Sequence, residues 1–195
     1  MTVERKKLDK QQQIIATAMT MFYQQGIHAV GINEILASSG IAKKTLYRYF
    51  ESKEQLIVAT LNQRHANFIH WLTALLAQES SPKAALIALF QGLDDWFNDR
   101  VELLGTFRGC YFINASAEYS QPEQPIFQVC QQHKQHIVAM IYGQTQRLPI
   151  PDADAKQLAY ALAILKDGCI TAAHVQDDRQ AAIKVIPTVK VLINQ

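Results

Sequence analysis

The side chains with the clearest chemical potential stand together in one short segment, residues 43–53. Within it, cations, a hydroxyl and aromatic rings surround two apolar residues, Leu46 and Phe50. Cationic and hydroxyl groups read base edges in the major groove of DNA and bind the phosphates beside it. The segment therefore predicts DNA contacts by Lys43, Lys44, Thr45, Tyr47, Arg48, Tyr49 and Lys53.

Chemistry divides these residues into two groups. Lys44 and Arg48 suit guanine O6 and N7, and Thr45 suits a thymine methyl or a base edge. Aromatic hydroxyls and a flexible ammonium suit phosphates, which fix the register of a protein on DNA without reading sequence. The residues of this second group are Tyr47, Tyr49 and Lys53. A solvated basic surface is the alternative interpretation.

The elements that must position these side chains are two short helices and a turn. Ile32, Ile35 and Leu36 make one apolar face. Gly40 then ends the helix, and glycine suits this place because helices commonly exit through a left-handed conformation. Leu46 and Phe50 restart the apolar pattern on a second helix. The arrangement predicts a helix-turn-helix.

A wider pattern surrounds this motif. It consists of Ile14, Ile15, Ala18, Phe22, Gly26, Ile35, Gly40 and the run KKTLYRYFESKEQL. On these residues, the segment 8–58 resembles the N-terminal domain of the TetR family of bacterial transcriptional regulators. The resemblance implies that Tyr47 and Lys53 grip the DNA backbone and that an inducer binds in the rest of the chain.

The chain departs from the family pattern where helices begin. The family usually has Thr or Ser at the places of Val30 and Gly31, and Ser at the place of Ala42. It also has Ala where this chain has Leu36 and Gly where it has Lys44. The missing hydroxyls remove side-chain caps and phosphate contacts, so Val30, Gly31 and Ala42 are not expected to bind DNA.

Hydrophobic periodicity predicts an all-α fold. Apolar stripes at helical spacing cover residues 8–25, 52–78, 82–100, 107–118, 126–146, 152–175 and 177–194. Ser52 and Gln55 have the spacing of a capping box, and Pro187 should kink the last helix or delay its start. We expect an N-terminal three-helix DNA-binding domain, residues 1–52, and a C-terminal helical domain for effector binding and dimerisation, residues 53–195.

Composition limits the class of protein. Eight basic and five acidic residues through Leu56 give +3, against +2 for the whole chain, so positive charge gathers mildly at the N-terminus. No apolar run approaches the roughly 18 residues that a membrane span needs, and no signal peptide is recognised. The three cysteines are widely spaced, which indicates reduced thiols. We expect a soluble cytoplasmic protein without a membrane partner.

The aromatic residues of the predicted C-terminal domain could enclose a small apolar effector, although core packing explains such residues more often. The expected ligand-binding residues are Trp71, Trp96, Phe107, Cys110, Tyr111, Asn114, Glu118, Phe127 and His133. Cys110 beside Arg108 has an alternative role as a thiol that senses oxidants or electrophiles. A buried, inert cysteine is the third possibility.

Metal binding and catalysis are not expected. Cys130, His133 and His136 are three residues apart, which leaves the outer pair about 240° apart around a helix, poorly placed for one ion. No phosphate loop, dinucleotide fingerprint or nucleophile elbow is present, so no enzyme activity and no cofactor are predicted. A thiol enzyme using Cys110 and His133, and an architectural DNA protein, remain as alternative hypotheses.

The C-terminal helices, residues 153–194, predict a homodimer. The apolar side of residues 159–175 is broader than one neighbouring helix covers. It is formed by Ala159, Leu162, Ala163, Leu165, Ile170, Ala173 and Val175. Two-fold symmetry would match a pseudo-palindromic operator, and the sequence predicts a repressor that a ligand releases from its DNA.

Overall fold

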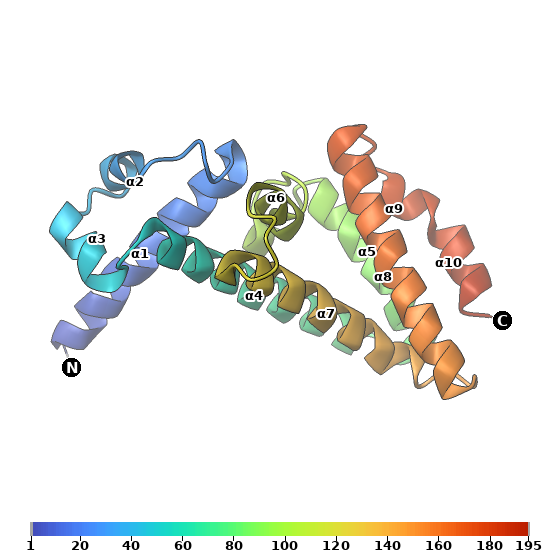
Figure 1. The fold of residues 1–195 in the computed structure, drawn as a ribbon. Helices are drawn as coiled ribbons and strands as arrows, with labels where there is room; N and C mark the ends of the chain where they lie inside the picture. Colours follow the sequence, from blue (N-terminus) through green and yellow to red (C-terminus); the bar gives the residue numbers. More distant parts are fainter. Residues whose placement is uncertain (1, 195) are drawn as a thin grey trace. The chain divides into compact units, whose positions relative to one another are not determined.

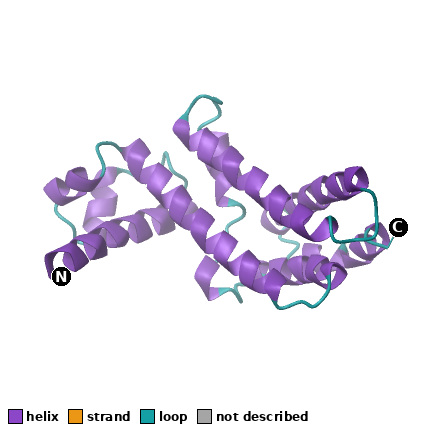
Figure 2. Ribbon diagram, turned by 90° about the horizontal axis from the view of Figure 1, so that it is seen from below, coloured by secondary structure: helices purple, strands orange, loops and turns teal. Residues whose placement is uncertain are grey.

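The computed structural model describes residues 2–194, with side chains from Lys10 onward, and these residues form helices joined by loops without a strand (Figures 1 and 2). The elements are α1 (Thr2–Gln25), α2 (Ile32–Ser39), α3 (Lys43–Tyr49), α4 (Lys53–Ala77), α5 (Pro82–Phe97), η1 (Glu102–Leu104), α6 (Tyr111–Glu118), α7 (Pro125–Thr145), α8 (Asp152–Val175), α9 (Ala181–Lys184) and α10 (Ile186–Leu192). The predicted all-α fold class is confirmed.

The chain divides into two compact units. Unit 1 comprises Met1–His65 and Tyr111–Gln131, and unit 2 comprises Ala66–Cys110 and Gln132–Gln195. Helices α4 and α7 contribute residues to both units, whereas α6 belongs to unit 1. The domain boundary expected at residue 52 stays a prediction.

In unit 1, α1, α2 and α3 pack around a small apolar core. Ile14, Phe22, Ile35 and Leu46 are buried there. Helix α2 ends at Gly40, whose φ of 67° lies in the left-handed region and whose amide donates to the Leu36 carbonyl at 3.0 Å. The predicted helix-turn-helix is therefore present, with glycine where the turn requires a positive φ.

Helix starts follow the expected chemistry only in part. Ser52 Oγ accepts from the Gln55 amide at 3.2 Å, but the Gln55 side chain accepts from the Glu51 amide at 2.9 Å and not from that of Ser52. The predicted capping box is thus half formed. Helix α5 starts at Pro82 behind Ser81, whose hydroxyl accepts from the Ala84 amide.

In unit 2, α5, α8, α9 and α10 pack against one another. The apolar side of α8 on which we expected the dimer to form is largely used inside the chain. Ala159, Leu162, Ala163, Ile170 and Ala173 are buried within the described residues. Their expected role in a dimer interface is wrong, because α5 and α9 already pack on α8. Pro187 lies in the first turn of α10 and separates it from α9, as predicted.

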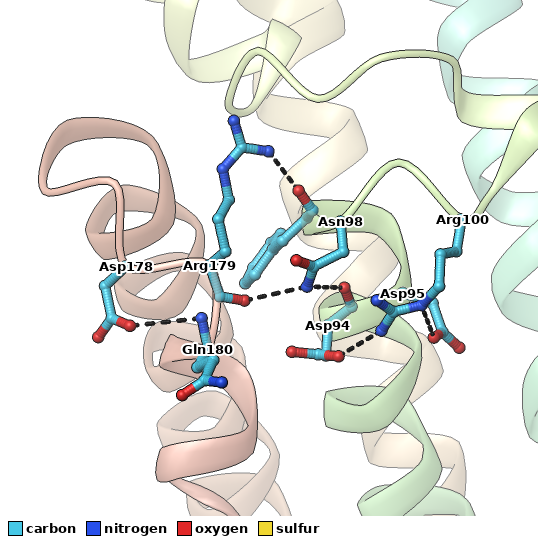
Figure 3. A network of polar contacts seen from close by, with 8 residues as sticks. Asp94, Asp95, Asn98, Arg100, Asp178, Arg179 and Gln180 are labelled. Carbon is cyan, nitrogen blue, oxygen red and sulfur yellow. Dashed lines mark hydrogen bonds and ion pairs between the residues drawn. The ribbon is translucent and has the colours of Figure 1, made fainter.

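A polar network joins the end of α5 to the α8–α9 connection (Figure 3). The Arg179 guanidinium donates to the Phe97 carbonyl, and the Asn98 amide donates to the Arg179 carbonyl at 3.3 Å. Arg100 forms ion pairs with Asp94 and Asp95 beside it. The Arg179 contact satisfies the Phe97 carbonyl, one of the backbone groups that the end of α5 leaves without a helical partner.

Helix α8 is long and apolar enough to cross a membrane by length and composition. Core helices meet the same criterion, and eight residues of α8 are buried in unit 2, among them the charged Lys166. Its composition therefore agrees with a core helix.

Candidate nucleic-acid interface

Helix α3 presents its polar side chains outward from unit 1. Leu46 and Phe50 are buried in the core, which fixes the rotation of the helix. Lys43, Lys44, Tyr47 and Arg48 are exposed, and Thr45 and Tyr49 are half-buried. The structure thus brings six of the seven predicted DNA-binding residues onto one short helix. The basic side chains of Arg5, Lys6 and Lys7, counted in the N-terminal charge, lie outside the described side chains.

The Arg48 guanidinium is held by its neighbour Tyr49. Its Nη2 donates to the Tyr49 hydroxyl at 3.0 Å, and its Cζ lies 5.0 Å from the centre of the Tyr49 ring. A guanidinium has five donors, so this contact leaves several for a base or a phosphate. The pair orders a long side chain before DNA is present, which lowers the entropy lost on binding.

The first turns of α2 and α3 have no side-chain caps. Gly31 and Ala42 occupy the N-cap positions, and neither makes a side-chain hydrogen bond. At Gly31, the Glu34 carboxylate accepts from the backbone amide at 2.9 Å. The loss of side-chain caps predicted from the missing hydroxyls is confirmed, and the loss of phosphate contacts stays a prediction.

Lys53 lies at the start of α4 and is half-buried. Its Nζ donates to the carbonyl oxygen of Ile27 at 2.7 Å and lies 5.7 Å from the centre of the Phe22 ring. The ammonium thus supports the turn between α1 and α2. An ammonium has three donors, so this bond leaves donors that could bind a phosphate. The phosphate contact of Lys53 stays a prediction.

Glu118, at the end of α6, contacts the same turn. Its carboxylate accepts from the amides of Ile27 at 2.8 Å and His28 at 2.6 Å, and its Oε2 lies 2.7 Å from His28 Nδ1. Partial burial alone would raise the pKa of Glu118, but these hydrogen bonds and the His28 ring hold that pKa below the usual value. We expected Glu118 to border a ligand; in the structure both of its oxygens bind the turn.

Tyr111 begins α6 and is buried in unit 1. Its hydroxyl lies 2.9 Å from Thr60 Oγ1 of α4, and burial raises its pKa well above the usual range. Its ring packs edge-on against Tyr23 of α1 at 5.8 Å. Asn114 and Phe127, two other predicted ligand residues of unit 1, are half-buried.

The predicted ligand residues of unit 2 other than Cys110 belong to an aromatic cluster. The ring centre of Trp96 lies 5.5 Å from that of Phe68 and 5.0 Å from that of Phe107. The ring centre of Phe68 also lies 5.0 Å from that of Trp71 and 5.5 Å from that of the buried His133. These edge-to-face contacts are typical of packed cores. A ligand among these rings requires the cluster to open, and their ligand role stays a prediction.

Cys110 lies in a group of charges that the sequence interpretation missed. The Lys134 ammonium donates to both oxygens of Asp167, at 2.8 and 2.9 Å, and also interacts with Cys110. Lys166, with only 2% of its side chain exposed, pairs with the same carboxylate at 2.6 Å. Burial lowers the pKa of Lys166, whereas attraction to Cys110 and Asp167 raises that of Lys134 against the effect of its burial. The sequence feature that could have revealed this group is the adjacent charged pair Lys166 and Asp167 on the otherwise apolar helix α8.

Two surface pockets of unit 2 lie apart from the expected ligand residues. The larger, of about 410 Å³, is lined by Leu148, Ile150, Asp154, Gln157, Leu158, Ala161, Leu192 and Ile193. The other, of about 400 Å³, lies between residues of α4 and the end of α7. Among the side chains of residues 10–194, no group of three His, Cys, Asp or Glu is placed to hold a metal ion.

The fold and the exposed α3 define a helix-turn-helix DNA-binding protein, and comparisons identify the family. The profile of the bacterial regulatory proteins of the tetR family matches residues 14–60. The transcriptional repressor NemR of Escherichia coli K12 is 31% identical over 111 residues, which are 56% of this chain and 54% of NemR. The chain thus matches only about half the length of this curated relative.

Solved structures extend the likeness over nearly the whole chain. SCO4454, a TetR-family regulator from Streptomyces coelicolor, is 27% identical with a TM-score of 0.84, and the match covers 95% of this chain and 88% of that one. The reduced form of E. coli NemR, 23% identical with a TM-score of 0.82, shares the fold over 95% of this chain and 97% of its own. Residues 14–60 thus match the TetR family of transcriptional regulators, and the chain shares its fold with solved members of that family.

Proposed function

We propose that this protein regulates transcription by binding operator DNA through α3. The observation that carries the proposal is that α3 has one buried apolar face and exposed polar side chains on its other faces. Leu46 is fully buried, while Lys43, Lys44, Tyr47 and Arg48 are exposed on the remaining faces. A helix of this kind can enter a major groove with cations and hydroxyls directed at bases and phosphates.

The protein acts as a homodimeric repressor in this proposal. Exposed apolar side chains on α8 and α10 support a dimer surface within the expected residues 153–194 but formed by other side chains of α8 than those expected. Tyr160, Ile164 and Val191 are 61%, 56% and 63% exposed. A two-fold dimer presents two α3 helices to half-sites separated by a whole number of DNA turns, about 34 to 36 Å each.

Selection of binding sites from random double-stranded DNA tests the proposal. The wild-type protein should enrich an inverted repeat, and affinity for the enriched duplex should exceed that for a scrambled duplex by about 10³ or more at equal salt. Equal affinity for both duplexes and a steep salt dependence would identify an architectural DNA protein instead.

For the effector, we propose a small apolar molecule that favours a conformation with weaker operator affinity. The aromatic cluster around Trp96 and the apolar lining of the larger pocket support this class of ligand. A coupling free energy of about 1 to 3 kcal/mol between ligand and operator makes a useful switch. Thermal shift with hydrophobic metabolites, followed by operator titration with each hit, tests it; absence of any reversible binder contradicts it.

A second candidate input is modification of Cys110, supported by the position of Lys134 beside this thiol. Reactive cysteines in proteins often lie beside cationic side chains. Burial raises the pKa of Cys169 to about 11, which makes that thiol a poor competitor. With iodoacetamide, Cys110 Sγ would form a bond to carbon, iodide would leave with its electron pair and the thiol proton would pass to solvent. Release of operator from wild type but not from Cys110→Ser supports this input; release from both contradicts it.

A further inference from the structure

Helix α6 is fixed at both ends within unit 1. At its first residue, the Tyr111 hydroxyl bonds Thr60 of α4 at 2.9 Å, and both residues are buried. At its last residue, Glu118 bonds the backbone between α1 and α2. The eight residues between these contacts form about two turns, or roughly 12 Å, of a rigid element.

The contact at Glu118 is directed at one place in the backbone. Its carboxylate accepts from the two successive amides of Ile27 and His28, at 2.8 and 2.6 Å. The His28 ring adds a third contact to the carboxylate and stacks on Tyr119 with ring centres 4.9 Å apart and planes 11° apart. Hydrogen bonds to a carboxylate are stronger than those between neutral groups.

The peptide group between Ile27 and His28 is also bound at its carbonyl end, by Lys53 of α4. Lys53 Nζ donates to the Ile27 carbonyl at 2.7 Å, while Glu118 accepts from the adjoining His28 amide. The carbonyl and the amide of that peptide group point in opposite directions, so a cation and an anion match its dipole. The turn that leads from α1 into the helix-turn-helix is therefore held between α4 and α6.

We infer that Glu118 is a positioning residue for DNA binding, through which α6 fixes the α1–α2 turn and hence the presentation of α3. The inference rests on the proposed function. The hydrogen bonds of Glu118 go to Ile27 and His28, outside α3, and its negative charge does not suit a phosphate; it acts through the turn.

The direction in which Glu118→Gln changes the affinity for operator DNA tests the inference. Removing a carboxylate from a DNA-binding unit strengthens DNA binding if electrostatics alone acts. If Glu118 positions the turn, Glu118→Gln weakens operator binding instead. Glu123→Gln removes an exposed carboxylate of the same unit and is the matched control. Full-length variants are titrated with the operator duplex enriched by wild type, and hydrogen exchange is measured over residues 26–30.

We expect Glu118→Gln to bind the operator about tenfold more weakly, with faster exchange at Ile27 and His28 and unchanged affinity for a scrambled duplex. Glu123→Gln should bind at least as tightly as wild type. Equal or tighter operator binding by Glu118→Gln overturns the inference. If wild type and Glu123→Gln show no preference for any duplex, the proposed function fails instead.

A variant that keeps the carboxylate covers the case in which Glu118→Gln does not fold. His28→Ala removes the ring contacts and leaves the amide at residue 28 available to Glu118. A loss of about threefold in operator affinity supports the inference. Unchanged affinity overturns it.

Discussion

Lys53 and Glu118 bind opposite ends of one peptide group, that between Ile27 and His28. Lys53 donates to the carbonyl oxygen at 2.7 Å, and Glu118 accepts from the amide nitrogen at 2.6 Å. The two side chains come from α4 and α6, and the residues are 65 positions apart in the chain. Lys53 therefore stabilises the α1–α2 turn in addition to its predicted phosphate contact. Its removal should lower both the stability of unit 1 and the affinity for DNA.

Lys53→Ala should weaken binding to all DNA sequences alike and also destabilise unit 1. The lost charge-assisted hydrogen bond predicts a decrease of about 1 to 3 kcal/mol in the free energy of unfolding. Lys43→Ala, which removes an exposed ammonium of α3, should weaken DNA binding without that loss of stability. Urea titration and DNA titration of both variants measure the difference; equal stability of the two variants would contradict the structural duty of Lys53.

Arg48→Ala should relax sequence preference. If Arg48 donates to guanine, about 1 to 3 kcal/mol of discrimination is lost at one base pair of each half-site. Tyr49→Phe removes only the hydroxyl that accepts from Arg48 and should cause a smaller loss. Titrations with the operator and with a duplex altered at that base pair provide the measurement. An equal loss on both duplexes for Arg48→Ala would assign this residue to the phosphate backbone.

Ile164→Glu should dissociate the dimer and leave unit 2 folded, because Ile164 is 56% exposed within the chain. Leu162→Glu should instead unfold unit 2, since Leu162 is fully buried there and an unpaired buried carboxylate is costly. Sedimentation velocity and circular dichroism separate the two results. A folded dimeric Ile164→Glu variant would place the dimer surface elsewhere.

The contribution of Glu118 to stability should vanish in acid. Its pKa is lowered in the folded chain, so its contribution is complete above the usual value of 4.5 and is lost as the pH falls through the lowered pKa. The groups near this carboxylate are His28, Tyr111 and Tyr119, and burial raises the pKa of both tyrosines, which stay neutral throughout. The difference in melting temperature between wild type and Glu118→Gln, measured from pH 7 to pH 3, should therefore narrow below pH 4.5. A constant difference would contradict the assignment.

Local patterns predicted the helices and the exposed polar faces of α3. The apolar spacing of Leu46 and Phe50 fixes which faces of α3 are buried, and this depends only on neighbours in sequence. Gly40 and Pro187 act through their own backbone restrictions, so the turn and the late start of α10 could also be predicted.

Contacts between distant segments could not be predicted in this way. The broad apolar side of α8 is compatible with a dimer or with packing inside the chain, and only the fold shows that α5 and α9 use it. Glu118 and Lys134 are polar residues whose roles depend on partners 90 and 24 residues away, His28 and Cys110. The hydrophobic periodicity of one segment does not show which distant residue its polar side chains will contact.

The most direct test of the central claim is a footprint of the wild-type dimer on its selected DNA, compared with Arg48→Ala at equal salt. We predict two protected major-groove segments, related by two-fold symmetry and centred a whole number of helical turns apart, which Arg48→Ala protects weakly or not at all. Uniform protection along the duplex, unchanged by Arg48→Ala, would contradict the assignment of α3 as the element that recognises an operator.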